Sequence, residues 1–416
     1  MNKKKIIGSA VVGNIVEYYD FGIYAVFAES IGRLYLPNPN EYIQLMLSFA
    51  VFAIGFLMRP LGGVLLGHIG DVFGRKVALS ISIIGMGLST VLIGLLPTYS
   101  QIGVWSSIFL ILIRIFQGLC IGGESAGAAI FILEHFHKTK VGLIGSIIMA
   151  SNITGTLLAL LTGILIKKLF GIDDFTWRYG FFLGGITGVI GYYMRRSAEE
   201  TPVFEKIRRE RKTSDILPIM VVLRKKWRSV LLIAALASVA TSNTYMLRGF
   251  FSVYFTEIIG VDKEQSLYLV SFSLISVILF LPFFGLVSDH IGYKKYIYSV
   301  VFSSSLLIIP LFRSIIISAN NLNSLYYCMF LSGALVASIV APYYPFSIKF
   351  FSPELRYSGI ALSWNIGNAL FGGTTPMVST FLVMTLGKTA PAYYLVAVSC
   401  LFMFISLLNR KILIDH

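Results

Sequence analysis

The chain has 416 residues, of which 56% are hydrophobic and only 13% are charged. Soluble domains carry about 25% charged residues, so this composition excludes a soluble globular protein and indicates an integral membrane protein. The net charge of +14 would also suit a nucleic-acid-binding protein. However, most of the excess lysine and arginine lies in alternate loops between apolar runs, which is the positive-inside pattern, so we expect no nucleic-acid partner.

Twelve apolar runs are each long enough to cross a bilayer as a helix, which needs about 20 mainly apolar residues. They cover residues 6–30, 43–67, 77–97, 104–133, 142–166, 177–194, 229–256, 267–288, 296–313, 322–348, 356–383 and 390–409. Twelve spans place both termini on one side, and the basic loops predict that this side is the cytoplasm. We therefore expect a multi-pass all-α membrane protein with both termini in the cytoplasm.

One long polar segment separates six of these runs from the other six. The predicted organisation is an N-terminal six-helix bundle over residues 1–194, a cytoplasmic linker over 195–228, and a C-terminal six-helix bundle over 229–416. The linker is rich in lysine and arginine, so we expect it to lie against the anionic surface of the membrane.

The two halves share a motif. The pattern Gly-x3-Asp-x2-Gly-x-Lys begins at Gly67 after the second run and recurs from Gly285 after the eighth, about half a chain later. Its acids are Asp71 and Asp289, and Arg75 of the first copy is replaced by Tyr293 in the second. A duplicated six-helix unit with a binding site between its halves is typical of secondary transporters.

Several stretches carry a resemblance to a known family. They are residues 13–21, 59–63, 67–76, 94–99, 114–127, 177–178, 200–204, 245–247, 356–359, 365–367 and 371–373. On these stretches the chain resembles the major facilitator superfamily, and more narrowly its metabolite:proton symporter family of proline/betaine, α-ketoglutarate, citrate and shikimate carriers. The resemblance implies twelve transmembrane helices in two pseudo-symmetric six-helix bundles, and import of a small organic solute with protons. It also implies a cytoplasmic gate at Asp71, Arg75 and Asp289.

Ionisable residues lie deep in two of the predicted spans. Glu17 and Asp20 lie near the centre of the first, and Arg114 and Glu124 lie within the fourth. A charge at this depth costs about 3 kcal/mol or more, so it usually faces a bundle interior or a water-filled path. We predict that Glu17, Asp20 and Glu124 are proton-coupling candidates, with Arg59 and Arg114 as their partners. Depth along the helices predicts the pairs Asp20–Arg114 and Glu124–Arg59; the alternative is that these acids are structural and never titrate.

Polar and aromatic residues in the spans are candidate substrate-binding residues. They are Tyr24, Gln117, Asn152, Tyr245, Arg248, Tyr344, Trp364, Asn365 and Asn368. Trp364 and the tyrosines would hold a quaternary ammonium through cation–π contacts, unless they are only core packing. Arg248, which stands where the family usually carries an aliphatic residue, would suit a substrate carboxylate. A zwitterion such as proline or betaine satisfies both features, and a dicarboxylate or tricarboxylate fits if the aromatic residues are core.

The leading interpretation is a proton-coupled symporter that imports such a zwitterion by alternating access. The alternatives are a carboxylate symporter of the α-ketoglutarate or citrate type and a non-transporting membrane sensor on the same fold. The sequence contains no Ser/His or metal-ligand set, so we expect no enzyme activity, cofactor or metal. We expect a monomer whose partners are the solute, protons and the lipid bilayer. Cys120, Cys328 and Cys400 have no disulfide or metal spacing and are predicted to be buried.

Overall fold

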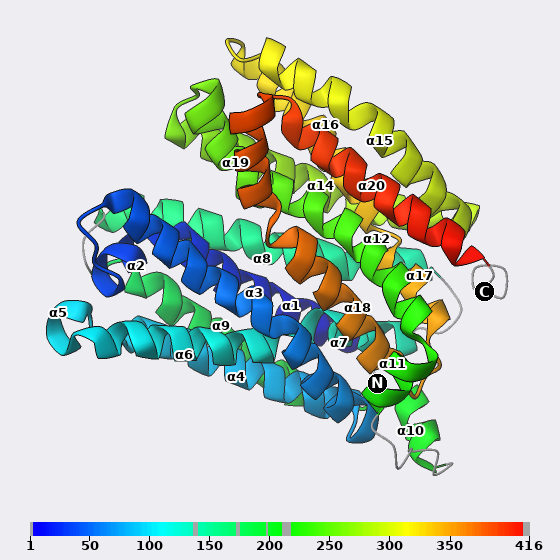
Figure 1. Cartoon of the computed structure of the whole chain (residues 1–416). Helices are drawn as coiled ribbons and strands as arrows, with labels where there is room; N and C mark the ends of the chain where they lie inside the picture. Colours follow the sequence, from blue (N-terminus) through cyan, green and yellow to red (C-terminus); the bar gives the residue numbers. More distant parts are fainter. Residues whose placement is uncertain (1–2, 136–139, 172–174, 197–198, 210–217, 411–416) are drawn as a thin grey trace. The chain divides into compact units, whose positions relative to one another are not determined.

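The described part of the chain is helical. The computed structural model describes residues 3–135, 140–171, 175–196, 199–209 and 218–410 (Figure 1). Within these ranges the chain forms helices joined by turns and short loops and contains no strand, which confirms the predicted all-α class. Two parts of the predicted linker, residues 197–198 and 210–217, lie outside the described residues.

Each of the twelve predicted spans coincides with a long helix or with helices that follow one another directly. In the first half these are α1 (Lys3–Val26), α3 (Glu41–Val72), α4 (Arg75–Leu95), α6 (Val104–Ile121) with α7 (Glu124–His135), α8 (Val141–Phe170) and α9 (Arg178–Arg196). In the second half, three spans are the single helices α14 (Lys263–Ile291), α15 (Tyr293–Ile317) and α20 (Ala390–Leu408). The other three spans start with α12 (Trp227–Tyr245), α16 (Leu322–Val340) and α18 (Arg356–Gly367), and each continues in the short helices that follow it. Ten of these spans in the described residues are long and apolar enough to cross a membrane. The others, α1 and α9, have 24 and 19 residues, so the twelve-helix membrane fold is as predicted.

Short helices mark where the predicted boundaries were wrong. The first span was predicted to reach residue 30, but α1 ends at Val26 and a separate helix, α2 (Ala28–Tyr35), follows it. The other short helices are α5 (Tyr99–Ile102), α10 (Pro202–Arg209), α11 (Pro218–Lys225), α13 (Phe251–Val253), α17 (Tyr343–Ser347) and α19 (Thr375–Leu386). Three further segments are π-helical, η1 (Met246–Phe250), η2 (Tyr254–Ile259) and η4 (Asn368–Gly372), and η3 (Ile348–Phe350) is a 3₁₀ turn. Single π-turns inside α-helices are frequent at functional sites.

Residue contacts divide the chain into two compact units. The first comprises Met1–His135 and Ser151–Ile219, and the second comprises Phe136–Ala150 and Met220–His416. The beginning of α8 therefore makes its contacts with residues of the second unit. The bundle and linker boundaries expected from the sequence stay a prediction, and each unit is described below by itself.

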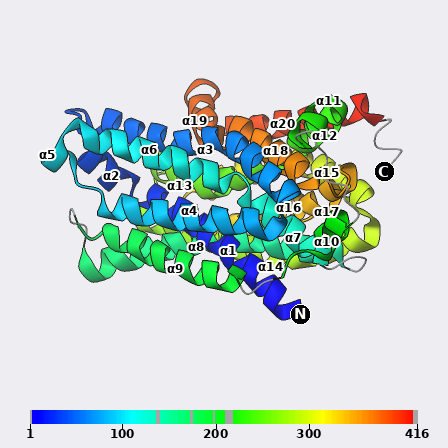
Figure 2. The ribbon, with the colours of Figure 1, turned by 90° about the horizontal axis from the view of Figure 1, so that it is seen from below.

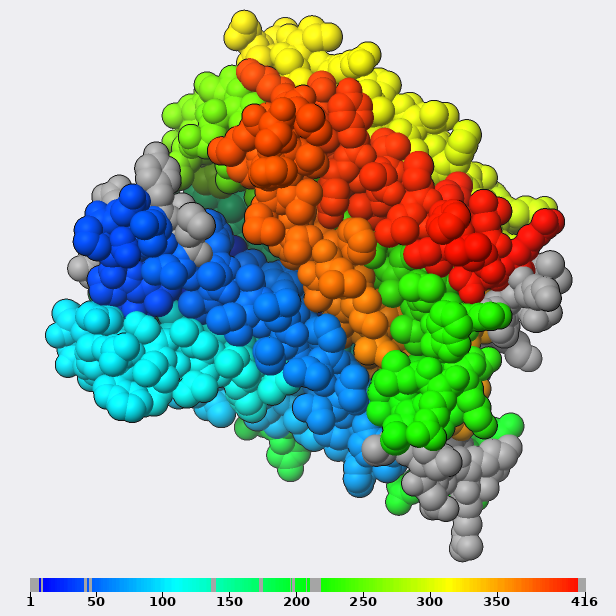
Figure 3. Space-filling model, in the orientation of Figure 1, coloured from blue at the N-terminus to red at the C-terminus, as the bar shows by residue number. Residues whose placement is uncertain are grey.

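In the first unit, pairs of long helices lie side by side. Helix α3 packs along α6, and α4 packs along α9 and α6 (Figures 1 and 2). The space-filling view shows the surfaces of α3 and α6 in contact along their length (Figure 3). Glycines permit this approach, because a Cβ at Gly122 would overlap the backbone of Arg59 and Gly63, and one at Gly62 would overlap that of Leu119.

We expect Gly122→Ala to destabilise the protein, because the added methyl group meets backbone atoms that have little freedom to move. Overpacking of this kind costs about 1–3 kcal/mol, so the midpoint of thermal unfolding in detergent falls. The matched control is Gly87→Ala in α4, where the nearest atom to an added Cβ is 3.5 Å away. Equal unfolding midpoints for the two variants would contradict the close approach of α3 and α6.

The second unit repeats this packing. Helix α14 lies along α16, and α12 is surrounded by α18 and α20. The apolar window of the span that begins with α12 is 94% buried, so protein rather than lipid covers it. Gly333 lies against the backbone of Ser273, as Gly122 does against α3 in the first unit.

Large apolar side chains on the outer faces of the helices are exposed. On α3 they recur four residues apart at Leu57, Leu61 and Leu65, each more than half exposed. Such a stripe is unfavourable in water and is the expected surface of a helix that contacts lipid. Cys120 and Cys328 are buried as predicted, but Cys400 is exposed on α20, so the prediction was wrong for that residue.

Candidate functional site

The repeated sequence motif is also a structural repeat. Gly74 joins α3 to α4 with φ = +118°, and Gly292 joins α14 to α15 with φ = +88°. This positive-φ region strongly favours glycine. The second glycine of each motif copy therefore makes the tight connection between two helices.

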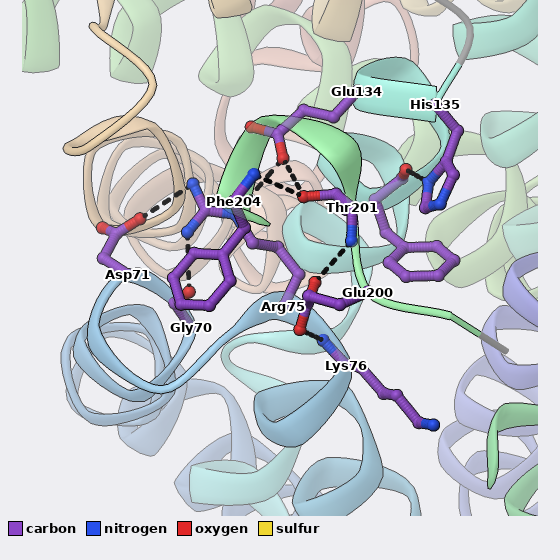
Figure 4. A network of polar contacts seen from close by, with 10 residues as sticks. Gly70, Asp71, Arg75, Lys76, Glu134, His135, Glu200, Thr201 and Phe204 are labelled. Carbon is purple, nitrogen blue, oxygen red and sulfur yellow. Dashed lines mark hydrogen bonds and ion pairs between the residues drawn. The ribbon is translucent and has the colours of Figure 1, made fainter. Parts of the chain in front are cut away.

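In the first copy, Arg75 lies at the centre of a buried polar network (Figure 4). Its guanidinium is fully buried, with Nη2 3.4 Å from Asp71 Oδ1 and Nε 3.3 Å from Glu134 Oε2. Nη1 donates a hydrogen bond to the Gly70 carbonyl at 2.7 Å. The ring of Phe204 lies 5.1 Å away on one face. The predicted neighbours Asp71 and Arg75 are thus in contact.

The same network ties the segment after α9 to the first unit. The Thr201 hydroxyl donates to Glu134 Oε2 at 2.8 Å and accepts from the Phe204 N–H near the start of α10. Glu200 accepts from the Lys76 N–H at 3.1 Å (Figure 4). Sequence reasoning missed Glu134. The signal was present, because this acid ends the same apolar run that carries Arg114 and Glu124.

In the second copy of the motif, backbone N–H groups and a tyrosine bind the aspartate in place of an arginine. Asp289 accepts hydrogen bonds from the N–H groups of Gly142 at 2.7 Å and Leu143 at 3.1 Å, both in the first turn of α8. A carboxylate is stabilised there because the first turn of a helix has unpaired N–H groups and a positive partial charge. The Tyr293 hydroxyl donates to the same carboxylate at 2.6 Å, so it occupies the role that Arg75 has in the first copy.

Glu17 and Asp20 are both buried but have different surroundings. The Ser125 hydroxyl lies 3.0 Å from both carboxylate oxygens of Glu17 and donates its single proton to this carboxylate. Asp20 is 0% exposed, and neither of its oxygens has a hydrogen-bond partner of normal geometry, although Thr90 and Arg114 lie close by. Its carboxylate abuts Gly184 of α9, where there is no side chain to donate a hydrogen bond. Glu124 is also buried and takes part in other interactions.

Of the two predicted ion pairs, Asp20–Arg114 has no hydrogen bond in this structure, and Glu124–Arg59 stays a prediction. The Arg114 Nη1 atom donates to the Gln117 side-chain oxygen, and its guanidinium carbon lies 3.5 Å from the centroid of the Tyr24 ring. Asp20 is within electrostatic range of Arg114 but does not contact it as an ion pair. Depth along a helix fixes the height of a side chain but not the direction in which it points, so depth alone does not assign these partners.

Arg59 lies over two aromatic rings of the first unit. Its guanidinium carbon is 4.3 Å from the centroid of Phe21 and 4.5 Å from that of Phe56. Gln117, next to Arg114, donates to the Thr90 hydroxyl at 3.1 Å. The first unit therefore brings Tyr24, Arg114 and Gln117 together, with Phe21 and Thr90 as neighbours that the sequence did not single out.

The remaining predicted binding residue of the first unit, Asn152, contacts α1. Its side-chain oxygen accepts a hydrogen bond from Asn14, whose amide also donates to Ser151 at 2.9 Å. This group joins α1 to α8.

In the second unit, three aromatic rings form one cluster. The centroid of Trp364 lies 4.7 Å from Tyr343 and 5.7 Å from Tyr344, and the two tyrosines lie 5.1 Å apart. At these distances the rings contact one another, so packing accounts for the cluster in this conformation.

Arg248 and Asn365, two other predicted residues of the second unit, contact residues that are close to them in the sequence. The Arg248 guanidinium lies 4.0 Å from the centroid of the Tyr245 ring. The Asn365 amide donates to the Ala361 carbonyl of its own helix at 2.8 Å, and Asn368 is buried at the start of η4. Among the described residues, no group of three or more His, Cys, Asp or Glu could hold a metal ion.

Comparison with known proteins gives consistent matches over the whole length. A family model described as the Major Facilitator Superfamily matches residues 10–247 and 234–412. The chain is 33% identical over 413 residues to a Staphylococcus aureus (strain COL) protein provisionally named a proline/betaine transporter, covering 98% of this chain and 88% of that protein. It is 30% identical over 420 residues to the glycine betaine/proline/ectoine/pipecolic acid transporter OusA of Dickeya dadantii (strain 3937), covering 98% and 83%.

A solved structure with the same fold is the proton:xylose symporter XylE bound to 6-bromo-6-deoxy-D-glucose. The superposition has a TM-score of 0.79 and covers 97% of this chain and 95% of that chain, at 15% sequence identity. At this identity the match establishes the fold, with its twelve helices in two six-helix bundles.

Proposed function

Since the chain belongs to the major facilitator superfamily, we propose that it is a proton-coupled symporter that imports a small zwitterionic solute of the proline or betaine type. In this proposal the protein works by alternating access, and Asp20 carries the coupled proton. The protein lies in the bacterial inner membrane as a monomer with both termini in the cytoplasm. The bundles are residues 1–194 and 229–416, joined by the cytoplasmic linker.

The proposal of proton coupling is based on the environment of Asp20. An ionised carboxylate that is buried without a hydrogen-bond donor is strongly unfavourable, whereas a protonated one costs much less. Asp20 is fully buried and its oxygens have no hydrogen-bond partner of normal geometry, while Arg114 lies within electrostatic range. A shift of Arg114 toward Asp20 would favour the ionised form, so a change of conformation can bind or release the proton.

The names of the relatives support the class of solute. OusA is named as a transporter of glycine betaine, proline, ectoine and pipecolic acid. Each of these solutes has a carboxylate and a cationic nitrogen. A cationic nitrogen is attracted to aromatic faces, and Trp364 with its neighbouring tyrosines is the candidate for that contact once the rings separate.

The repeated motif supports a role away from the solute. Asp71 and Arg75 in the first copy, and Asp289 in the second, lie at turns between helices and form buried or helix-capping contacts. We assign these residues to a cytoplasmic gate.

Uptake by purified protein in proteoliposomes tests the proposal. We expect labelled L-proline or glycine betaine to accumulate when the external pH is lower than the internal pH, and the accumulation to collapse when a protonophore is added. Parallel uptake of α-ketoglutarate and citrate tests the carboxylate alternative. Uptake that is equal with and without a pH gradient contradicts proton coupling, and no uptake of any of the four solutes contradicts the transport proposal.

A further inference from the structure

Two arginines of the first unit are buried without a hydrogen-bonded anion. Arg59 is 1% exposed and Arg114 is 0% exposed. The Nε and Nη2 atoms of both side chains have no hydrogen-bond partner. Buried charged groups are normally paired or hydrogen-bonded, because an unpaired buried charge is costly. The two side chains therefore offer unused donors in an interior position.

The two guanidinium groups lie around the same aromatic ring. Their carbon atoms are 4.3 Å (Arg59) and 5.5 Å (Arg114) from the centroid of Phe21. They are close enough for Arg59 to act electrostatically on Arg114. Two like charges held together in the protein interior repel each other, and the repulsion is relieved when an anion binds to both.

We propose that Arg59 and Arg114 form the subsite that binds the carboxylate of the transported solute. This inference rests on the proposed function and names the feature of the solute that the first unit recognises. A guanidinium matches a carboxylate through two parallel N–H···O bonds, and each arginine has adjacent nitrogens that are unused. Solutes with a free carboxylate fit this subsite, whereas their amides and purely cationic analogues do not.

The subsite differs from the one expected from the sequence, where Arg248 of the second unit was predicted to receive the carboxylate. Arg248 is only partly buried, lies against the Tyr245 ring, and takes part in other interactions. Arg59 and Arg114, by contrast, come from two helices, α3 and α6, whose backbones are in contact. Their relative position is therefore held by the most closely packed part of the unit.

The test is ligand-induced stabilisation of the full-length purified protein in detergent. L-Proline, glycine betaine, α-ketoglutarate and citrate are compared with L-prolinamide and choline, which lack the carboxylate, and with sodium chloride. We expect one or more of the carboxylates to raise the thermal unfolding midpoint, and the carboxylate-free analogues to leave it unchanged. Arg59→Gln and Arg114→Gln are expected to weaken that binding by on the order of 10- to 100-fold, the range for a lost hydrogen bond to a charged group.

Three further variants make the result decisive. Arg59→Lys keeps the charge without the paired donors, so it should retain part of the binding if the variant site is intact. Arg209→Gln, which removes an exposed arginine, should bind like the wild type. Arg248→Gln tests the sequence-based alternative. The proposal is overturned if the Gln variants at 59 and 114 bind like the wild type, if only Arg248→Gln loses binding, if chloride protects as well as the carboxylates do, or if no carboxylate protects.

The two proposals fail in different assays. If carboxylates stabilise the protein through Arg59 and Arg114 but no solute enters proteoliposomes, the transport proposal fails and the subsite stands. If the proteoliposomes take up L-prolinamide as well as L-proline, transport stands and the carboxylate subsite is wrong.

Discussion

Asp20→Asn is expected to abolish uphill accumulation of solute in proteoliposomes while leaving exchange of labelled for unlabelled solute intact. Asparagine has nearly the shape of a protonated aspartic acid but cannot release a proton. A gradient of one pH unit can sustain roughly tenfold accumulation of a solute that moves with one proton, since about 1.4 kcal/mol corresponds to a factor of ten. In the variant this ratio should fall to about one.

The other two buried acids provide the comparison for this experiment. Glu17→Gln and Glu124→Gln are measured in the same assay, and the acid whose amide loses accumulation but keeps exchange is the coupling group. Exchange activity in each variant also establishes that it is folded. If Asp20→Asn accumulates solute like the wild type and one of the other two does not, Asp20 is not the proton carrier.

Arg75→Gln is expected to cause the largest loss of stability among single changes at the described ion pairs. The substitution leaves Asp71 and Glu134 buried without their shared cation, and breaking a buried pair in this way costs about 3–5 kcal/mol. The midpoint of thermal unfolding in detergent should fall accordingly, and the yield of folded protein from membranes should decrease.

A second arginine in the same unit provides the matched control. Arg209 pairs with Glu205 at 3.9 Å, but both side chains are more than half exposed. Exposed pairs contribute about 0–1 kcal/mol, so Arg209→Gln should leave the unfolding midpoint nearly unchanged. Equal effects of the two substitutions would show that the network around Arg75 does not hold the connection between α3 and α4 in place.

The number and order of the membrane spans could be predicted from the sequence, because hydrophobic length is a local property. The ends of the spans could not be predicted as well. The break at Phe27 was missed because the run was taken as continuous through Glu29 and Ser30, the polar residues that follow the break. The repeat in the sequence motif corresponds to a repeat in backbone conformation. Gly74 and Gly292 adopt positive φ in both copies, so one sequence pattern corresponds to one backbone geometry.

The candidate site could be predicted only as a set of residues. Asp20, Arg59 and Arg114 stand out in the sequence alone, because charges are rare in apolar spans. Their partners could not be assigned, since helix depth leaves the rotation of each helix about its own axis undetermined. Phe21, which lies beside both arginines, gave no signal, because one phenylalanine among 32 in the chain is not distinctive.

The π-turns that follow α12 bear on how relatives of this chain can differ in length. Each π-turn accommodates one residue more than an α-helical turn, so the side chains beyond it are out of phase with those before it. Deleting one residue within η1 would convert the π-turn into an α-helical turn, so the later side chains of that helix would keep their directions. The same deletion within a regular α-helical turn would rotate every later side chain by about 100°. A one-residue gap at η1 in an alignment would therefore mark the loss of the π-turn rather than a different lining of the helix.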